Sequence, residues 1–167
     1  MAAKADKEKR FMDVLSQFDG VVRRVCFMYA GPEYLFDDLY QETMANLWRS
    51  LDTFRGDSGL STWIYRVTVN TCISWTRTNR RHAGHADLDE AVQLVAGDDA
   101  DDRAFMRTMY RLISRLDPLD KAIVMMQLDE KSYDEIAAVT GLTRNNVAVR
   151  LHRAKERLRT MTKELES

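Results

Sequence analysis

Turn-forming residues and cysteines are scarce in this chain, which has 7 Gly, 2 Pro and 2 Cys among 167 residues. So few glycines and prolines disfavour β-sandwiches and barrels, which depend on many tight turns. Cys26 and Cys72 show no Cys-x-x-Cys spacing, which argues against a disulfide scaffold or a cysteine zinc site and fits a reducing cytoplasm. No apolar run approaches the roughly 20 residues that cross a bilayer. Residues 1–10 lack the apolar segment of a secretory signal. We therefore expect a cytoplasmic protein with no membrane span.

Charge is close to balanced overall, with 25 basic and 26 acidic residues, but it is strongly segregated along the chain. Residues 55–81 carry five basic groups and one acidic group, and residues 143–159 carry six and one. Between them, residues 82–104 carry one basic and seven acidic groups. Two basic blocks indicate two surfaces for a polyanion, separated by a segment that bare DNA would repel. Charge alone leaves open the alternative that these blocks are solvated faces.

Apolar residues recur every three or four positions, which predicts an all-α fold without strands. The first helices are expected at residues 11–29, 36–51 and 61–78, with Ser61 as the N-cap of the third. The first of these would end before Gly31.

Residues 82–104 contain no aromatic side chain and are rich in Asp and Ala, so we predict a flexible acidic linker there. The linker would separate a helical domain at residues 1–81 from a second one at residues 105–167. The expected architecture is therefore two small all-α domains.

A helix-turn-helix is predicted near the C-terminus. Ser132 and Glu135 form a capping-box pattern, Gly141 suits the left-handed turn, and Thr143 can cap the last helix. Asparagine and arginine at the start of such a helix can reach base edges in the major groove. An ordinary helical hairpin with a basic face is the alternative. The exposed face is expected to carry Arg144, Asn145, Asn146, Ala148, Val149, His152, Arg153 and Lys155.

The third expected helix combines aromatic and basic residues, as surfaces for single-stranded nucleic acid do. Asn70, Ser74 and Arg77 are three or four residues apart and share a polar face. For Trp63 and Trp75, burial in the core and stacking on a base remain equally open.

Motifs in both halves of the chain resemble those of the extracytoplasmic-function (group 4) sigma factors. The resemblance to their region 2 lies in Asp38-Leu-Tyr-Gln41-Glu42, Leu47-Trp48, Phe54-Arg55-Gly56, Ser61-Thr-Trp63-Ile-Tyr-Arg66 and Val69-Asn70. The resemblance to region 4 runs from Leu116-Asp-Pro through the helix-turn-helix to Arg153-Ala154-Lys155.

This resemblance implies a bacterial initiation factor that binds core RNA polymerase and promoter DNA, and that an anti-sigma factor inhibits. It places polymerase contacts at Asp38, Gln41, Glu42 and Trp48. Minus-ten contacts are implied at Arg55, Gly56, Asp57, Ser58, Trp63, Arg66, Asn70, Ser74 and Arg77. Minus-thirty-five contacts are implied at Ala148, Val149, His152 and Arg153, although many members have arginine where this chain has Ala148.

Other readings are weaker. Gly56-Asp57-Ser58-Gly59 matches the nucleophile loop of trypsin-like proteases, but those enzymes need β-barrels and a histidine base. His82 and His85 form only a lone His-x-x-His, and Asp98–Asp102 lacks a ligand loop, so no metal and no other cofactor is expected. A stand-alone helix-turn-helix regulator, or a module that sequesters another regulator, remains the alternative to a sigma factor. For a sigma factor, we expect that the chain itself carries no covalent chemistry.

Overall fold

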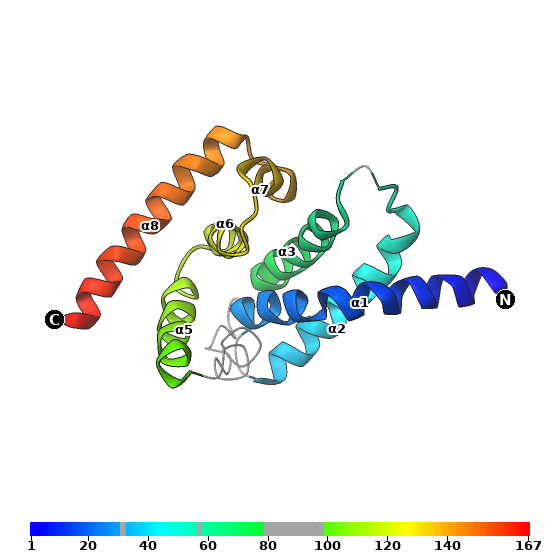
Figure 1. Cartoon of the computed structure of the whole chain (residues 1–167), viewed down its shortest axis with the longest axis horizontal. Coiled ribbons are helices and arrows are strands. Elements are labelled where there is room, and N and C mark those ends of the chain that lie inside the picture. Colours follow the sequence, from blue (N-terminus) through cyan, green and yellow to red (C-terminus); the bar gives the residue numbers. More distant parts are fainter. Residues whose placement is uncertain (31–32, 57, 79–98) are drawn as a thin grey trace.

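The computed structural model describes residues 1–30, 33–56, 58–78 and 99–167, and in these every regular element is a helix (Figure 1). The prediction of an all-α fold is therefore confirmed. The elements are α1 (Ala2–Tyr29), α2 (Glu33–Ser50), a short 3₁₀ helix (Leu51–Thr53), α3 (Leu60–Thr78), α5 (Ala100–Ile113), α6 (Pro118–Leu128), α7 (Tyr133–Thr140) and α8 (Arg144–Glu166). Most of the predicted linker lies outside the described residues.

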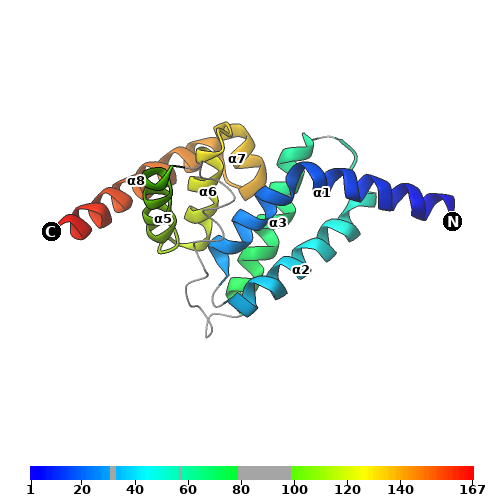
Figure 2. The ribbon, with the colours of Figure 1, turned by 60° about the horizontal axis from the view of Figure 1, so that its bottom comes forward.

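Helices α1, α2 and α3 pack together around aromatic and aliphatic side chains (Figure 2). The rings of Phe27 and Phe36 stack with centroids 3.8 Å apart and join α1 to α2. Cys26 and Cys72 are fully buried, and their sulfur atoms lie 4.0 Å apart between α1 and α3. Both cysteines therefore act as small apolar core residues, as the sequence indicates.

Helices α5 to α8 form the second group, in which α7 begins and ends, and α8 begins, at the predicted caps. The Ser132 hydroxyl accepts from the backbone N–H of Glu135, whose carboxylate accepts in turn from the Ser132 N–H. Gly141 ends α7 with φ of 75°, and the Thr143 hydroxyl accepts from the Asn146 N–H to cap α8. These contacts confirm the helix-turn-helix, α7–turn–α8.

Helix boundaries differ from the prediction at several places, including α2, which begins at Glu33 and not at residue 36. α1 begins at Ala2, nine residues before the apolar pattern starts. α5 begins at Ala100, inside the predicted linker, because the Asp99 side chain caps it. The prediction of Ser61 as an N-cap is wrong. α3 already begins at Leu60, and the Ser61 hydroxyl accepts a hydrogen bond from Lys131 Nζ at 2.6 Å.

The two groups of helices lie against each other, and buried side chains from both belong to one apolar cluster. Tyr29, at the end of α1, is 7% exposed and donates its hydroxyl proton to the backbone oxygen of Pro118 at the start of α6. The N- and C-termini lie at opposite ends of the long axis (Figure 1). This arrangement places α3 beside α7 (Figures 1 and 2).

Candidate nucleic-acid and polymerase interfaces

The turn before α3 is held from inside by an aromatic pair. Trp63 is 7% exposed, and its ring lies 5.0 Å from the ring of Phe54. Gly56 has φ of 78°, a conformation that glycine adopts without strain. The side chain of Arg55 is exposed and that of Ser58 is half-buried, whereas Asp57 lies outside the described residues. Of the two possibilities for Trp63, the structure shows burial in the core.

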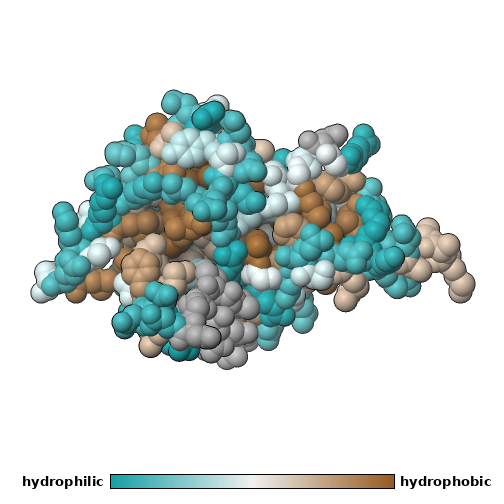
Figure 3. Space-filling model, viewed as in Figure 1, coloured by the Kyte–Doolittle hydropathy of each residue, from teal (hydrophilic) through white to brown (hydrophobic). Residues whose placement is uncertain are grey.

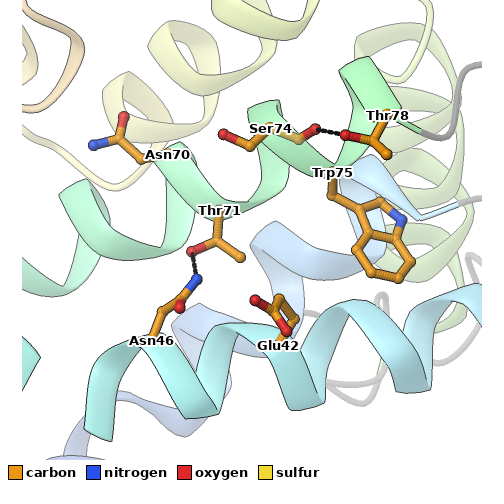
Figure 4. A pocket seen from close by; sticks show the side chains of 7 residues that line it. All are labelled: Glu42, Asn46, Asn70, Thr71, Ser74, Trp75 and Thr78. Carbon is orange, nitrogen blue, oxygen red and sulfur yellow. Dashed lines mark hydrogen bonds between the residues drawn. The ribbon is translucent and has the colours of Figure 1, made fainter. Parts of the chain in front are cut away.

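The polar face predicted on α3 is present. Asn70, Ser74 and Arg77 are all exposed. Asn70 and Ser74 border a groove of about 460 Å³ between α2 and α3 (Figure 4). Glu42 and Trp75 line the same groove, so a nucleic-acid strand that lies along this part of α3 would also contact α2.

The floor of that groove is fixed by hydrogen bonds. Asn46 Nδ2 donates to the Thr71 hydroxyl at 3.0 Å, and this bond joins α2 to α3 (Figure 4). Arg49 Nη1 donates to Asn46 Oδ1 at 2.7 Å and orients the amide. The groove is therefore a preformed feature of the helix pair.

The predicted polymerase-binding residues lie on α2. Asp38, Gln41 and Glu42 are exposed. Gln41 and Glu42 follow Asp38 by three and four residues, so both lie on the same side of the helix as Asp38. Trp48 is half-buried instead. Its ring lies edge-on to Phe11 at 5.2 Å, with Lys7 Nζ 4.4 Å from its centroid. Trp48 therefore attaches the N-terminal part of α1 to α2.

The DNA-facing residues predicted on α8 form an open surface. Ala148 is half-buried, and the other predicted residues are exposed. Two side chains missed by the sequence reasoning hold this helix in place: Arg150 Nη1 lies 2.7 Å from Asp120 Oδ1 of α6. The exposed members of the surface are Arg144, Asn145, Asn146, Val149, His152, Arg153 and Lys155.

Arg66 lies differently from the other predicted DNA contacts. Its Nε and Nη2 donate to the backbone oxygen of Ala138 in α7, at 3.2 and 3.1 Å. Sequence reasoning missed the residues that join the two helical groups, above all Arg24 and Asp129, which form a bidentate ion pair at 2.9 and 3.0 Å. No sequence pattern marks this pair, because it connects residues 105 positions apart.

Burial shifts the pKa of several side chains near these surfaces. Burial, together with the hydrogen bond to Asp19, raises the pKa of Tyr40 to about 12. Burial lowers the pKa of Lys121, whose Nζ lies 5.2 Å from the ring centroid of Tyr29. Burial is the main cause that raises the pKa of Cys72, and the neighbouring Cys26 adds to it. The raised pKa keeps the Cys72 thiol protonated and unreactive.

Apolar side chains are also exposed in the α5–α8 group. On the face shown in Figure 3, they gather in the hollow enclosed by α5, α6 and α8. Phe105 is 64% exposed and Leu128 is 52% exposed, and both line a cavity of about 240 Å³ between α5 and α6.

Among the described residues, no three His, Cys, Asp or Glu side chains are grouped to hold a metal ion. His82, His85 and Asp98 lie outside those residues. None of the helices described is both long and apolar enough to cross a membrane.

Comparison with known proteins assigns both groups of helices. The family model for Sigma-70 region 2 matches residues 15–82, and the model for Sigma-70, region 4 matches residues 106–158. The chain is 33% identical over 132 residues to the ECF RNA polymerase sigma-E factor of Escherichia coli K12, covering 71% of this chain and 69% of that protein. The chain belongs to the ECF sigma factors. It is thus an alternative sigma factor for transcription initiation, and a stand-alone regulator is not favoured.

Further relatives cover almost the whole sigma factor. The ECF sigma factor SigW of Bacillus subtilis is 25% identical over 175 aligned positions, covering 97% of this chain and 94% of that protein. Two solved structures share the fold. CnrH in complex with the cytosolic domain of CnrY gives a TM-score of 0.68 at 21% identity, covering 94% of this chain and 90% of that one. RpoE in complex with the anti-sigma factor NepR, from Bartonella quintana, gives a TM-score of 0.67 at 19% identity, covering 95% of this chain and 97% of that one.

Proposed function

We propose that this ECF sigma factor divides promoter recognition between its two groups of helices. The first group, at residues 1–81, would bind core RNA polymerase and the minus-ten element, and the second, at residues 105–167, would bind the minus-thirty-five element. The observation that carries the proposal is the order of the matches: region 2 coincides with the polar groove and region 4 with the exposed basic face. Such a factor would act in the cytoplasm and would catalyse no reaction itself.

Helix α2 offers the polymerase contacts in this proposal. Asp38, Gln41 and Glu42 present carboxylate and amide groups on one exposed face, which suits a basic or hydrogen-bonding partner helix. Trp48 would act from behind this face, because its ring holds α1 against α2.

The opened minus-ten strand would run over the turn before α3 and along the groove. Arg55 and Arg77 would follow the phosphates, while Asn70 and Ser74 would bond to unstacked bases. Gly56, Asp57 and Ser58 would surround a flipped base. Because Trp63 is buried, its part would be to support this turn through Phe54.

Helix α8 would dock in the major groove of intact duplex. Arg144, Asn145 and Asn146 stand at its N-terminal end, where recognition helices approach base edges. Because the side chain of Ala148 is small, Val149 and His152 are the larger side chains in the middle of that face. Arg153 and Lys155 would contact base edges or phosphates beside them.

An anti-sigma factor is the second partner that we propose. The structure matched at a TM-score of 0.67 is a sigma factor bound to such an inhibitor. In this chain, Phe105 and Leu128 offer exposed apolar surface next to a cavity. An apolar helix of an inhibitor would bury these two side chains.

Run-off transcription tests the proposal as a whole. Core polymerase and a genomic promoter library are incubated with and without the sigma factor, and the new transcripts are sequenced. We expect transcripts that start only when the factor is present and that share two upstream elements. A chain that forms no complex with core polymerase, or starts no transcript, would overturn the proposal.

A further inference from the structure

The N-terminal part of α1, residues 2–10, lies outside the stretch matched to Sigma-70 region 2, which begins at residue 15. This end of the helix has little local support. In the described structure no side chain caps it, and its first turn carries no acidic residue. A helix end of this kind depends on tertiary contacts. Here the contacts come from α2 and from the 3₁₀ helix Leu51–Thr53.

Lys7 makes the central contact. Its Nζ lies 4.4 Å from the ring centroid of Trp48 on α2 and donates to Asp52 Oδ2 in the 3₁₀ helix at 2.6 Å. Phe11, one turn later on the same face of α1, meets the Trp48 ring edge-on at 5.2 Å. The Lys7 side chain is only 18% exposed, although it lies near the end of the chain. One ammonium group therefore joins α1, α2 and the 3₁₀ helix.

The contact depends on the combination of ring and carboxylate. The Asp52 side chain is 61% exposed, and an exposed ion pair contributes little by itself. The face of a half-buried tryptophan ring attracts the same ammonium group. Because Phe11 packs α1 against this ring, Lys7 reaches Asp52 from a fixed position.

The 3₁₀ helix leads directly into the turn before α3. Leu51 is 2% exposed, and its backbone oxygen accepts from the Phe54 N–H at 3.3 Å. The Phe54 ring packs on Trp63, whose N–H donates to the Gly59 oxygen at 3.0 Å, beyond the turn. The turn is therefore fixed on both sides, and Lys7 acts on the side where the chain enters it.

We propose that Lys7 is a positioning residue for the minus-ten turn. By holding Asp52 against α1, it fixes the direction in which the chain enters the turn. It also neutralises a carboxylate that lies three residues before Arg55 and would repel the phosphates of an approaching strand. The role in DNA binding rests on the proposed function, but the bracing of the 3₁₀ helix does not.

Amide hydrogen exchange in the full chain, followed residue by residue by NMR, tests the bracing. Lys7→Met keeps the length of the side chain and removes the ammonium group. We expect the Phe54 amide, which bonds to Leu51, to exchange about three- to tenfold faster, the scale of one lost ion pair and one lost cation–π contact. Lys7→Arg keeps the charge and should restore slow exchange.

Lys4→Met is the matched control, because it removes the same charge from an exposed position one turn earlier in α1. It should leave the exchange of Phe54 unchanged. Asp52→Asn removes the ion pair but leaves the ring contact, so its effect should be smaller than that of Lys7→Met. Unchanged exchange in Lys7→Met, an equal effect of Lys4→Met, or a failure of Lys7→Arg to restore slow exchange would overturn the bracing.

Binding of the holoenzyme to DNA tests the positioning of the turn. The probe is a single-stranded oligonucleotide that carries the minus-ten element shared by the run-off transcripts. Lys7→Met should weaken its binding about three- to tenfold and leave binding of the minus-thirty-five duplex unchanged. An abasic site in place of the base that the turn holds should remove the difference between Lys7→Met and the unmodified protein. A difference that survives an abasic site at every position would indicate a general structural defect and overturn the positioning role.

Affinity for core polymerase is measured in parallel, because Lys7 also contacts Trp48. An equal loss there would mean that Lys7 acts on the polymerase contact and not on the turn. Faster exchange without weaker strand binding would likewise refute the positioning role. If exchange changes as expected in a chain that starts no transcripts, the bracing stands and the proposed function fails. If transcripts start but Lys7→Met changes neither exchange nor strand binding, the inference about Lys7 fails.

Discussion

The hydroxyl of Ser132 and the carboxylate of Glu135 satisfy each other's backbone N–H groups across the first turn of α7. Substituting a capping serine by alanine costs about 1 kcal/mol. Ser132→Ala should therefore lower the free energy of unfolding by that amount in urea titrations. Thr160→Ala, in the exposed body of α8, is the control and should change it much less. Equal effects of the two substitutions would show that the cap contributes nothing specific.

Glu130 ends α6 in a left-handed conformation, with φ of 59°. The Lys131 N–H bonds to the Met126 oxygen at 3.0 Å, as expected where a helix ends in this way. Glycine adopts this conformation without strain, so Glu130→Gly should stabilise the protein by up to about 1 kcal/mol. Glu130→Ala keeps the Cβ atom and should give no such gain. Thermal unfolding measures both, and a gain with alanine would mean that backbone strain is not the cause.

Tyr40 links α2 to Asp19 of α1, and its pKa of about 12 lies above the ordinary value of 10.0. A raised pKa means that the folded protein holds this proton more tightly than the unfolded chain. The stabilisation is complete below pH 10 and is lost as the pH rises toward 12. Tyr40→Phe should therefore be less stable than the unmodified protein at neutral pH. The difference in the free energy of unfolding between the two proteins should become smaller above pH 10. A difference that stays the same from neutral pH to pH 12 would contradict this.

Asp38 stands on the exposed face of α2 proposed to bind polymerase. Asp38→Ala should weaken the complex with core polymerase by about 2 kcal/mol, the scale of a central interface residue. Asp13→Ala, an exposed carboxylate on α1, is the control for charge alone. Binding is measured by fluorescence anisotropy of the labelled sigma factor. Unchanged affinity in Asp38→Ala would remove this residue from the interface.

Arg153 lies on the open face of α8. Arg153→Ala should weaken binding of the upstream promoter element by about 1–3 kcal/mol if the guanidinium contacts a base or a buried phosphate. Lys163→Ala removes the same charge in the last turn of α8 and should have little effect. Holoenzyme binding to promoter duplex measures both. An undiminished affinity in Arg153→Ala would assign this residue to the solvated face.

Local signals predicted the fold well because helix periodicity and caps depend on neighbours in the chain. The Ser132–Glu135 pair and Gly141 are examples. Ser61 shows the limit of such signals. Its residue type suits a cap, but Lys131, 70 positions away, uses its hydroxyl. The contact between Arg24 and Asp129 could not be predicted from local signals either, because it depends on how the two groups of helices pack against each other.

The candidate interfaces divide in the same way. Asn70, Ser74 and Arg77 were predicted to share a polar face, and the structure shows all three exposed. The burial of Trp63 could not be predicted, since an aromatic ring suits a core and a base stack equally well. Only the packing of its ring on Phe54 decides between them.

The apolar cluster shared by the two groups of helices gives their separation a thermal signature. Drawing them apart would expose apolar side chains to water and raise the heat capacity of the protein. Hydrophobic stabilisation weakens on cooling, so the compact form would be held together more by its ion pair, and less by apolar contact, in the cold. Removing the Arg24–Asp129 ion pair would therefore weaken the compact form most at low temperature.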